Sequence, residues 1–134
     1  MVDMKVEHIL IADDDVDDIN LLTEAILEYS PKVTVTYVTN GVKLLDKLKS
    51  GYMPDVLILD LAMPLKDGKW SLKEIRNNIE WVNLIIIVYT TGYSERMQME
   101  CLKLGANYFI TKPTTMVTMR NIAREICEAT FEFK

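Results

Sequence analysis

The stretch ILIADDDVDD, residues 9–18, joins a short apolar run to a dense group of acids. The run ends at Ala12, and five of the next six residues are aspartates. A short apolar run that stops at polar residues is typical of a buried strand, and the apolar spacing that follows, at Val16, Ile19 and Leu22, is typical of one helix face. The stretch therefore predicts a strand followed by a helix, with acids at the junction.

The same unit recurs along the whole chain. Strand-like apolar runs lie at His8–Ala12, Val33–Val38, Val56–Asp60, Leu84–Thr90 and Tyr108–Ile110. Helical patterns lie at Asp15–Tyr29, Val42–Leu48, Trp70–Asn78, Glu95–Leu104 and Met116–Phe133. Strands that alternate with helices form parallel sheets, and nearly continuous apolar strands are buried on both faces. The sequence therefore predicts an α/β fold with a doubly wound, five-stranded parallel sheet.

Size and charge narrow the class of protein. The chain has 134 residues, which fits one domain, and a net charge of −5. The negative charge argues against a nucleic-acid partner or an anionic membrane surface, because both are bound through basic residues. No apolar segment reaches the roughly 18 residues that a membrane span requires, and no secretory signal precedes the first strand. We expect a cytoplasmic protein.

Functional side chains are expected where the strands end, because open parallel sheets bind their ligands beyond the carboxyl ends of the strands. Asp13 and Asp14 follow the first strand, and Asp60 ends the third. Thr90 ends the fourth strand, and Lys112 follows the fifth. The fold therefore predicts that three carboxylates, a hydroxyl and an ammonium meet at one edge of the sheet.

The aspartates of residues 13–18 divide into two groups. Asp15 is placed to cap the first helix, and Asp17 and Asp18 lie in its first turn, where acids stabilise the positive end of the helix dipole. We interpret these three as structural. Asp13 and Asp14 precede the helix, and with Asp60 they form an acidic cluster whose repulsion favours a bound cation. Oxygen ligands of this kind suit Mg²⁺.

At these residues the sequence resembles the receiver domains of bacterial two-component response regulators. LIADDD (10–15) is similar to the acidic pair of that family, and VLILDLAMPLKDG (56–68) to its phosphoacceptor segment. IVYTTG (87–92) is similar to the segment with the hydroxyl residue that ends the fourth strand, and YFITKP (108–113) to the segment with the lysine before a proline. The resemblance implies a flavodoxin-like (βα)₅ arrangement with strand order 2-1-3-4-5.

The resemblance also implies a chemistry for each acid. Asp60 would be the nucleophile that accepts a phosphoryl group from a phosphohistidine. Asp13, Asp14 and Asp60 would hold Mg²⁺, directly or through water, together with the backbone carbonyl of Ala62. Such a protein is a phosphoacceptor with slow self-dephosphorylation and is not an enzyme in its own right.

The remaining implied roles concern switching. Thr90 would hydrogen-bond the phosphoryl oxygens, and Lys112 would pair with Asp60 before transfer and with the phosphoryl group after it. Phe109 would be the aromatic residue that turns inward when Thr90 moves. The peptide bond between Lys112 and Pro113 would be cis.

The resemblance covers roughly residues 6–130, so we expect residues 1–134 to be a single receiver domain without an output domain. Its partners would be a sensor histidine kinase or a phosphotransfer protein, and a downstream protein that docks on residues 94–133. We expect a monomer or a phosphorylation-dependent dimer. The alternative is a degenerate receiver that acts as a phosphorylation-independent interaction module. A flavin carrier of the same topology is disfavoured, because Asp13 and Asp14 would repel the flavin phosphate.

Overall fold

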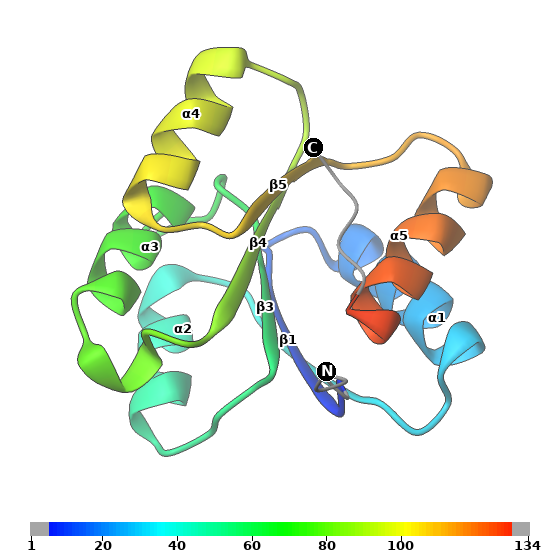
Figure 1. Ribbon diagram of the computed structural model, residues 1–134, viewed down its shortest axis with the longest axis horizontal. Coiled ribbons are helices and arrows are strands. Elements are labelled where there is room, and N and C mark those ends of the chain that lie inside the picture. Colours follow the sequence, from blue (N-terminus) through cyan, green and yellow to red (C-terminus); the bar gives the residue numbers. More distant parts are fainter. Residues whose placement is uncertain (1–5, 130–134) are drawn as a thin grey trace.

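Strands and helices alternate along residues 6–129, which are the residues that the computed structural model describes (Figure 1). The strands are β1 (His8–Ala12), β2 (Thr34–Val38), β3 (Val56–Leu59), β4 (Ile85–Thr90) and β5 (Tyr108–Thr111). The α-helices are α1 (Val16–Tyr29), α2 (Gly41–Lys49), α3 (Gly68–Arg76), α4 (Glu95–Leu104) and α5 (Met116–Glu128). A 3₁₀ turn, η1 (Ile79–Trp81), lies between α3 and β4 and was not expected from the sequence.

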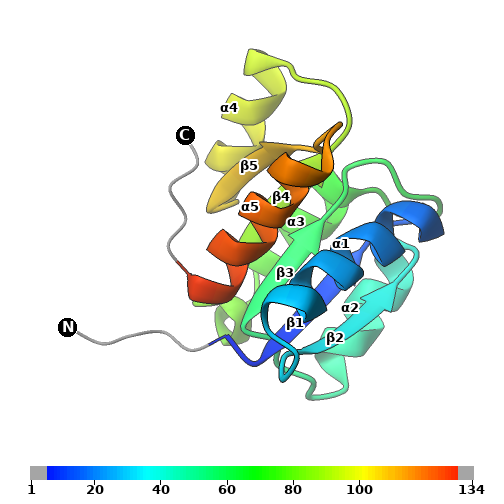
Figure 2. The ribbon, with the colours of Figure 1, turned by 90° about the vertical axis from the view of Figure 1, so that its right-hand side faces the viewer.

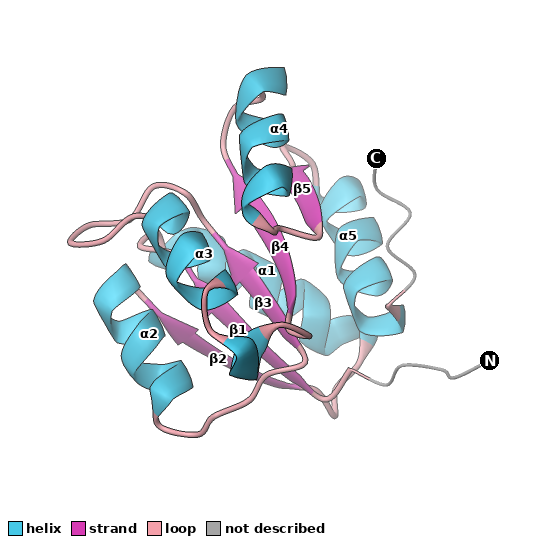
Figure 3. Ribbon diagram, turned by 60° about the vertical axis from the view of Figure 1, so that its left-hand side comes forward, coloured by secondary structure: helices cyan, strands magenta, loops and turns pink. Residues whose placement is uncertain are grey.

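The strands form one parallel sheet in the order β2-β1-β3-β4-β5, which confirms the predicted α/β fold (Figure 3). Its register pairs Ala12 with Leu59, Leu59 with Val88, and Thr90 with Thr111. The last residues of β1, β3, β4 and β5 therefore lie at one edge of the sheet. This edge is where the sequence places the acids, the hydroxyl and the lysine.

Helices cover both faces of the sheet. Helices α1 and α5 lie on one face, and α2, α3 and α4 lie on the other (Figures 1 and 2). Residues of each strand alternate between the two cores: Leu57 and Leu59 pack with α2 and α3, whereas Val56 and Ile58 pack with α1 and α5. Among the helices of residues 6–129, none combines the length and the apolar character that crossing a bilayer requires.

Each α-helix begins after a side chain that accepts a hydrogen bond from its first turn. These N-caps are Asp15, Asn40, Asp67, Ser94 and Thr115. The Asp67 cap starts α3 at Gly68, two residues before the predicted start. Only glycine fits at 68, because a Cβ there would lie 2.4 Å from the carbonyl oxygen of Asp60.

The other boundaries move by a residue or two, as frayed ends do. β3 ends at Leu59, so Asp60 is the first residue beyond the strand. α5 ends at Glu128, where Ala129 adopts the left-handed conformation of a helix C-cap. The end predicted for this helix, at Phe133, lies outside the described residues.

Arg76, the last residue of α3, ties together the loops at the opposite edge of the sheet. Its guanidinium donates hydrogen bonds to the carbonyl oxygens of Gly105 (2.8 Å), Trp81 (2.8 Å) and Leu84 (2.7 Å). It also donates to Oδ1 of Asn107, and the same oxygen accepts a hydrogen bond from the backbone N–H of Ile86. One side chain thus bonds acceptors of both the α3–β4 and the α4–β5 connection, and of these acceptors the Trp81 carbonyl also accepts from the backbone N–H of Leu84.

We expect the Arg76→Met substitution to lower the free energy of unfolding by about 2–4 kcal/mol, because the carbonyls of Gly105 and Leu84 lose the donor that Arg76 provides. Urea unfolding followed by circular dichroism measures the change. Arg96→Met is the matched control, since the Arg96 side chain is largely exposed on α4 and pairs there with Glu100. An Arg76 variant as stable as the Arg96 variant would contradict this role.

Candidate functional site

Asp13 directly follows β1 and is held from both sides. Its carboxylate accepts hydrogen bonds from the backbone N–H of Asp15 (2.9 Å) and from Nζ of Lys112 (2.8 Å). The residue is only 1% exposed. Burial raises the pKa of Asp13 to about 6, although the bonds from Lys112 and Asp15 oppose the rise. This carboxylate is therefore a costly buried charge that a cation would stabilise.

Asp60 lies beside Asp13, one residue beyond β3. Its backbone N–H donates to the carbonyl oxygen of Ala12 (2.9 Å), which fixes it against the end of β1. Oδ1 accepts hydrogen bonds from Oγ1 of Thr90 (2.9 Å) and from the backbone N–H of Ala62 (3.2 Å), and Oδ2 accepts from Nζ of Lys112 (3.1 Å). Asp60 is 5% exposed, so both of its oxygens are positioned in a largely dry environment.

Lys112 is the cation at the centre of the site. Its Nζ contacts the carboxylates of Asp13, Asp18 and Asp60 at 2.8, 2.8 and 3.1 Å. It also lies 5.8 Å from the centroid of the Tyr89 ring. Burial lowers the pKa of Lys112, but the bonds to Asp13 and Asp18 and the charge of Asp60 raise it further, so the net pKa lies above its ordinary value. The lysine therefore stays charged.

The acidic cluster predicted from the sequence does form. Carboxylate oxygens of Asp13, Asp14 and Asp60 lie within 4.8 Å of one another, and Asp14 is exposed while the other two are buried. Oxygen donors in this number, open to solvent on one side, fit a hard divalent cation that keeps part of its water shell. The carbonyl of Ala62 as a further ligand stays a prediction.

Thr90 and Phe109 lie on the same face of the sheet. Phe109 pairs with Val88, two residues before Thr90, and packs into the core under α3 and α4. Phe109 is already buried, at 7% exposed, and the Thr90 hydroxyl is already bonded to Asp60. The structure therefore has both side chains inward, and their role as a switch stays a prediction.

One residue of the site was given a purely structural role from the sequence. Asp17 and Asp18 do lie in the first turn of α1, with their N–H groups bonded to the Asp15 cap. The Asp18 carboxylate, however, also accepts a hydrogen bond from Lys112. Side chains in a helix tilt toward its N-terminus, so an acid in the first turn points to the edge where the strands end. That tilt was the available signal.

The expectation of a cis bond between Lys112 and Pro113 is wrong for this structure, since no cis peptide bond occurs in residues 6–129. The trans form is the intrinsic preference of an X–Pro bond. It is compatible with the site, because Lys112 donates its backbone N–H to the carbonyl of Thr90 while Nζ reaches Asp13, Asp18 and Asp60.

The loop after Asp60 contains a strained turn that the sequence did not indicate. Leu65 has a φ of 67°, and the N–H of Lys66 donates to the carbonyl of Pro64 at 2.8 Å, which closes a three-residue γ-turn. This form is rare, because a Cβ is unfavourable at positive φ. The carbonyl of Lys66 then accepts from the N–H of Gly41, so α2 holds the loop in place.

We expect Leu65→Asn to raise the free energy of unfolding by about 0.5–1 kcal/mol, because asparagine tolerates positive φ better than leucine. Little packing is lost, since Leu65 is 75% exposed. Thermal and urea unfolding measure the gain. Leu102→Asn is a suitable control: Leu102 is a partly exposed residue within α4, where asparagine should destabilise. A Leu65 variant that loses stability would contradict the strained turn.

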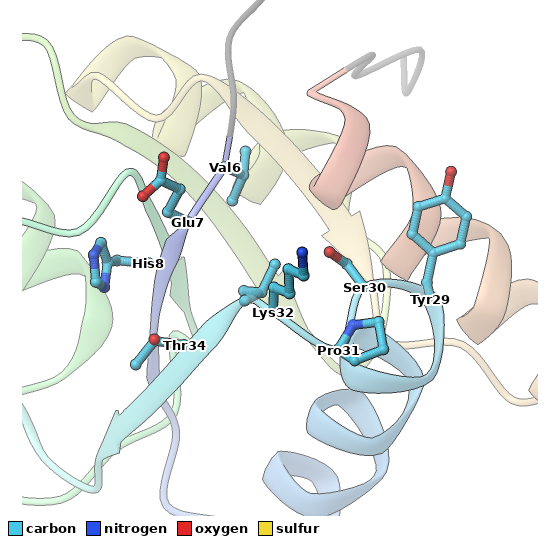
Figure 4. Close-up of a pocket in the computed structure, with 9 residues that line it drawn as sticks. Val6, Glu7, His8, Tyr29, Ser30, Pro31, Lys32 and Thr34 are labelled. Carbon is cyan, nitrogen blue, oxygen red and sulfur yellow. The ribbon is translucent and has the colours of Figure 1, made fainter.

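Two cavities lie at opposite ends of the sheet. One, of about 420 Å³, opens beside Asp60 and is lined by Leu61, Ala62, Thr90 and Thr91, with part of the loop that leads to α4. The other, of about 500 Å³, lies near the starts of β1 and β2 and is lined by His8, Thr34 and the Tyr29–Val33 turn (Figure 4). Of these two, only the first lies next to Asp60, through its neighbour Leu61 and its hydrogen-bond partners Ala62 and Thr90.

This fold and this acidic edge belong to a defined family. The sequence model of one protein family, the response regulator receiver domain, matches residues 9–124 of this chain. The chain therefore belongs to the family of response regulator receiver domains of two-component signalling, with an acidic pocket at the carboxyl edge of a flavodoxin-like sheet.

Among curated proteins, a protein-glutamate methylesterase/protein-glutamine glutaminase of Bacillus licheniformis is 29% identical over 112 residues, which are 84% of this chain and 31% of that protein. The sensor histidine kinase CheAY of Helicobacter pylori is 32% identical over 99 residues, which are 69% of this chain and 12% of that protein. The matches thus span about a third or less of these relatives.

Among solved structures, the phosphorylated cyanobacterial phytochrome response regulator RcpA has a TM-score of 0.83 at 26% identity, with 90% of this chain and 91% of that chain covered. The Mn²⁺-bound form of response regulator Rcp1 has a TM-score of 0.82 at 23% identity, with 94% and 95% covered, and shows the shared fold.

Proposed function

We propose that this chain is a phosphoacceptor in two-component signalling and that Asp60 is the residue phosphorylated. The observation that carries the proposal is the fixation of the Asp60 carboxylate by Thr90, Ala62 and Lys112 beside Asp13 and Asp14. In the transfer, a carboxylate oxygen attacks phosphorus and forms a P–O bond. The P–N bond to a donor phosphohistidine breaks, and its electron pair stays on the imidazole nitrogen.

The residues around Asp60 have roles that follow from charge. Transfer replaces one carboxylate charge by nearly two charges on the phosphoryl oxygens. The Lys112 ammonium and the Thr90 hydroxyl already touch Asp60, so they can bond the new oxygens without a large movement. Asp13, Asp14 and Asp60, with the Ala62 carbonyl, would hold Mg²⁺, which supplies further positive charge against the transferring group. The Mn²⁺-bound state of Rcp1 supports a divalent cation.

Signal output would follow from the contacts that the phosphoryl group gains. Thr90 can exchange its bond to Asp60 for a bond to phosphoryl oxygen, and Phe109 lies on the same face beneath α4. Phosphorylation can shift the equilibrium between two conformations only by the difference in free energy of these contacts. The face formed by α4, β5 and α5 would report the state to a protein partner. Of the docking segment expected at residues 94–133, the part beyond residue 129 lies outside the described residues.

The proposed phosphodonor is a histidine kinase or a phosphotransfer protein. This proposal is supported by family membership and by the named activity of CheAY, a sensor histidine kinase with a matching segment. A cytoplasmic location, and a monomeric or phosphorylation-dependent dimeric state, belong to the same proposal. The donor histidine would enter through the cavity beside Ala62 and Thr90.

The test is incubation with acetyl phosphate and Mg²⁺, followed by mass spectrometry of the intact protein. We expect wild type to gain one phosphoryl group and Asp60→Asn to gain none. Asp67→Asn is a control, because Asp67 caps α3 in the same loop and makes no contact with Lys112. Failure of the wild type to gain a phosphoryl group with an intact fold would favour the phosphorylation-independent interaction module.

Residue 62 is expected to set how long the phosphoryl group lasts. Ala62 lies on the wall of the cavity beside Asp60, and its methyl group has no polar atom to orient a water for attack. We expect Ala62→Asn to shorten the half-life of the phosphorylated protein several-fold, because an amide can position that water. Radiolabel decay after removal of the donor measures it. An unchanged or longer half-life would refute the prediction.

A further inference from the structure

Asp18 is a carboxylate that the proposed transfer does not use. It lies in the first turn of α1, and its Oδ2 accepts a hydrogen bond from Nζ of Lys112 at 2.8 Å, as short as the bond between Lys112 and Asp13. The contact is not needed to cap α1, since the Asp15 side chain already accepts hydrogen bonds from the N–H groups of Asp17 and Asp18. The contact joins α1 to the loop after β5, far apart in the sequence.

The three carboxylates use the whole bonding capacity of Lys112. An ammonium group has three N–H donors and no acceptor. Asp13, Asp18 and Asp60 provide three acceptors within 3.1 Å. Phosphorylation converts the Asp60 carboxylate into an acyl phosphate and moves its charge onto the phosphoryl oxygens, so Lys112 must turn from Oδ2 of Asp60 toward those oxygens while Asp13 and Asp18 still hold it.

Asp18 is the carboxylate that gives up its place most easily. Of the two carboxylates that remain, the Asp13 side chain is 2% exposed, so separating it from the ammonium would leave a buried charge unpaired. The Asp18 side chain is 31% exposed and can exchange the lysine for water. Its backbone position does not depend on the pair, because the Asp15 cap holds the helix turn.

We propose that Asp18 is a positioning residue that holds Lys112 toward α1 and competes with the phosphoryl group for its ammonium. This proposal rests on the proposed function. When the phosphoryl group forms, Lys112 follows the charge from Asp60 to the phosphoryl oxygens and gives up Asp18, whose carboxylate exchanges the ammonium for water at the start of α1. Asp18 thereby weakens the phosphorylated state relative to the free state, and a neutral side chain at 18 strengthens it.

The test uses beryllofluoride, a phosphoryl analogue, with Mg²⁺ and the chain of residues 1–134, and calorimetry gives the affinity. We expect Asp18→Asn to bind beryllofluoride about three- to tenfold more tightly than wild type, a modest range because the lost pair is partly exposed. Asp17→Asn is the matched control, because it removes the same charge from the same turn, while no Lys112 contact of Asp17 occurs within residues 6–129. Asp18→Glu should restore the wild-type affinity within twofold.

A second measurement reports the contact itself. The ¹⁵Nζ resonance of Lys112, assigned by its loss in Lys112→Met, should move in metal-free Asp18→Asn and stay in place in Asp17→Asn. Thermal unfolding shows that each variant is folded. If wild type binds no beryllofluoride, the proposed function fails and this inference fails with it. If wild type binds it and Asp18→Asn binds no more tightly than Asp17→Asn, or leaves the Lys112 resonance unmoved, the inference alone is overturned.

Discussion

Replacing Lys112 by methionine is expected to destabilise the protein by about 2–4 kcal/mol at pH 7.5 without divalent cations. The Lys112 ammonium is the only cation within salt-bridge distance of Asp13 and Asp60 in residues 6–129, and both carboxylates are buried. Methionine keeps the apolar stem but leaves these charges unpaired. Saturating Mg²⁺ should restore most of the loss, because a cation that binds only the folded state stabilises it. Urea unfolding in EDTA and in Mg²⁺ measures both effects.

Lys69→Met is the control for this prediction. Lys69 pairs with Glu100 at 2.6 Å, but both side chains are more than a third exposed, and such pairs contribute at most about 1 kcal/mol. The free energy of unfolding of Lys69→Met should therefore differ little from that of wild type and should rise with Mg²⁺ by the same amount. Two results would show that Lys112 does not neutralise the acidic cluster. One is equal stability of the Lys112 and Lys69 variants in EDTA. The other is a rise in stability with Mg²⁺ that is no larger for the Lys112 variant than for the Lys69 variant.

The second large effect is a gain in stability from Asp13→Asn. Burial raises the pKa of Asp13 from 3.8 to about 6, so the folded state holds this proton more tightly than the unfolded state. A group with a raised pKa favours the folded state most below its unfolded pKa, and this advantage declines as pH rises to about 6. Asparagine keeps the hydrogen-bond acceptor and carries no charge. In EDTA the variant should therefore exceed wild type by about 2–3 kcal/mol at pH 7.5.

The stability difference between Asp13→Asn and wild type should increase with pH. The difference between Asp13→Asn and wild type should be near zero at pH 3.5, grow between pH 4 and pH 6, and level off above that range. Asp46→Asn, at an exposed position of α2, is a control and should stay within about 0.5 kcal/mol of wild type throughout. Mg²⁺ should reduce the difference by stabilising wild type. A constant difference, or one that shrinks as pH rises, would contradict the cost assigned to the Asp13 charge.

The meeting of Asp13, Asp14, Asp60, Thr90 and Lys112 could be predicted because it depends on topology alone. Parallel strands end at one edge, so residues that follow four different strands must gather there. The pattern of apolar runs is enough to identify those strands, whose register then pairs Ala12 with Leu59 and Leu59 with Val88.

Features that depend on the packing of one helix or loop could not be predicted in the same way. The contact of Asp18 with Lys112 needs the orientation of α1 against the loop after β5. The four bonds of Arg76 need the path of two loops at the far edge. Leu65 at positive φ runs against local preference, because the loop is fixed at both ends, by Gly41 and by Gly68 against Asp60. Local sequence carries little information on any of these.

The most direct measurement is identification of the residue that carries the phosphoryl group. Protein treated with acetyl phosphate and Mg²⁺ is reduced with borohydride, which converts an aspartyl phosphate into homoserine, and is then digested and mapped by tandem mass spectrometry. We predict homoserine at position 60 and at no other aspartate, with none formed when Mg²⁺ is replaced by EDTA. Homoserine at 13, 14 or 18, or unmodified Asp60 in protein that has gained a phosphoryl group, would contradict the assignment of Asp60 as the phosphoacceptor.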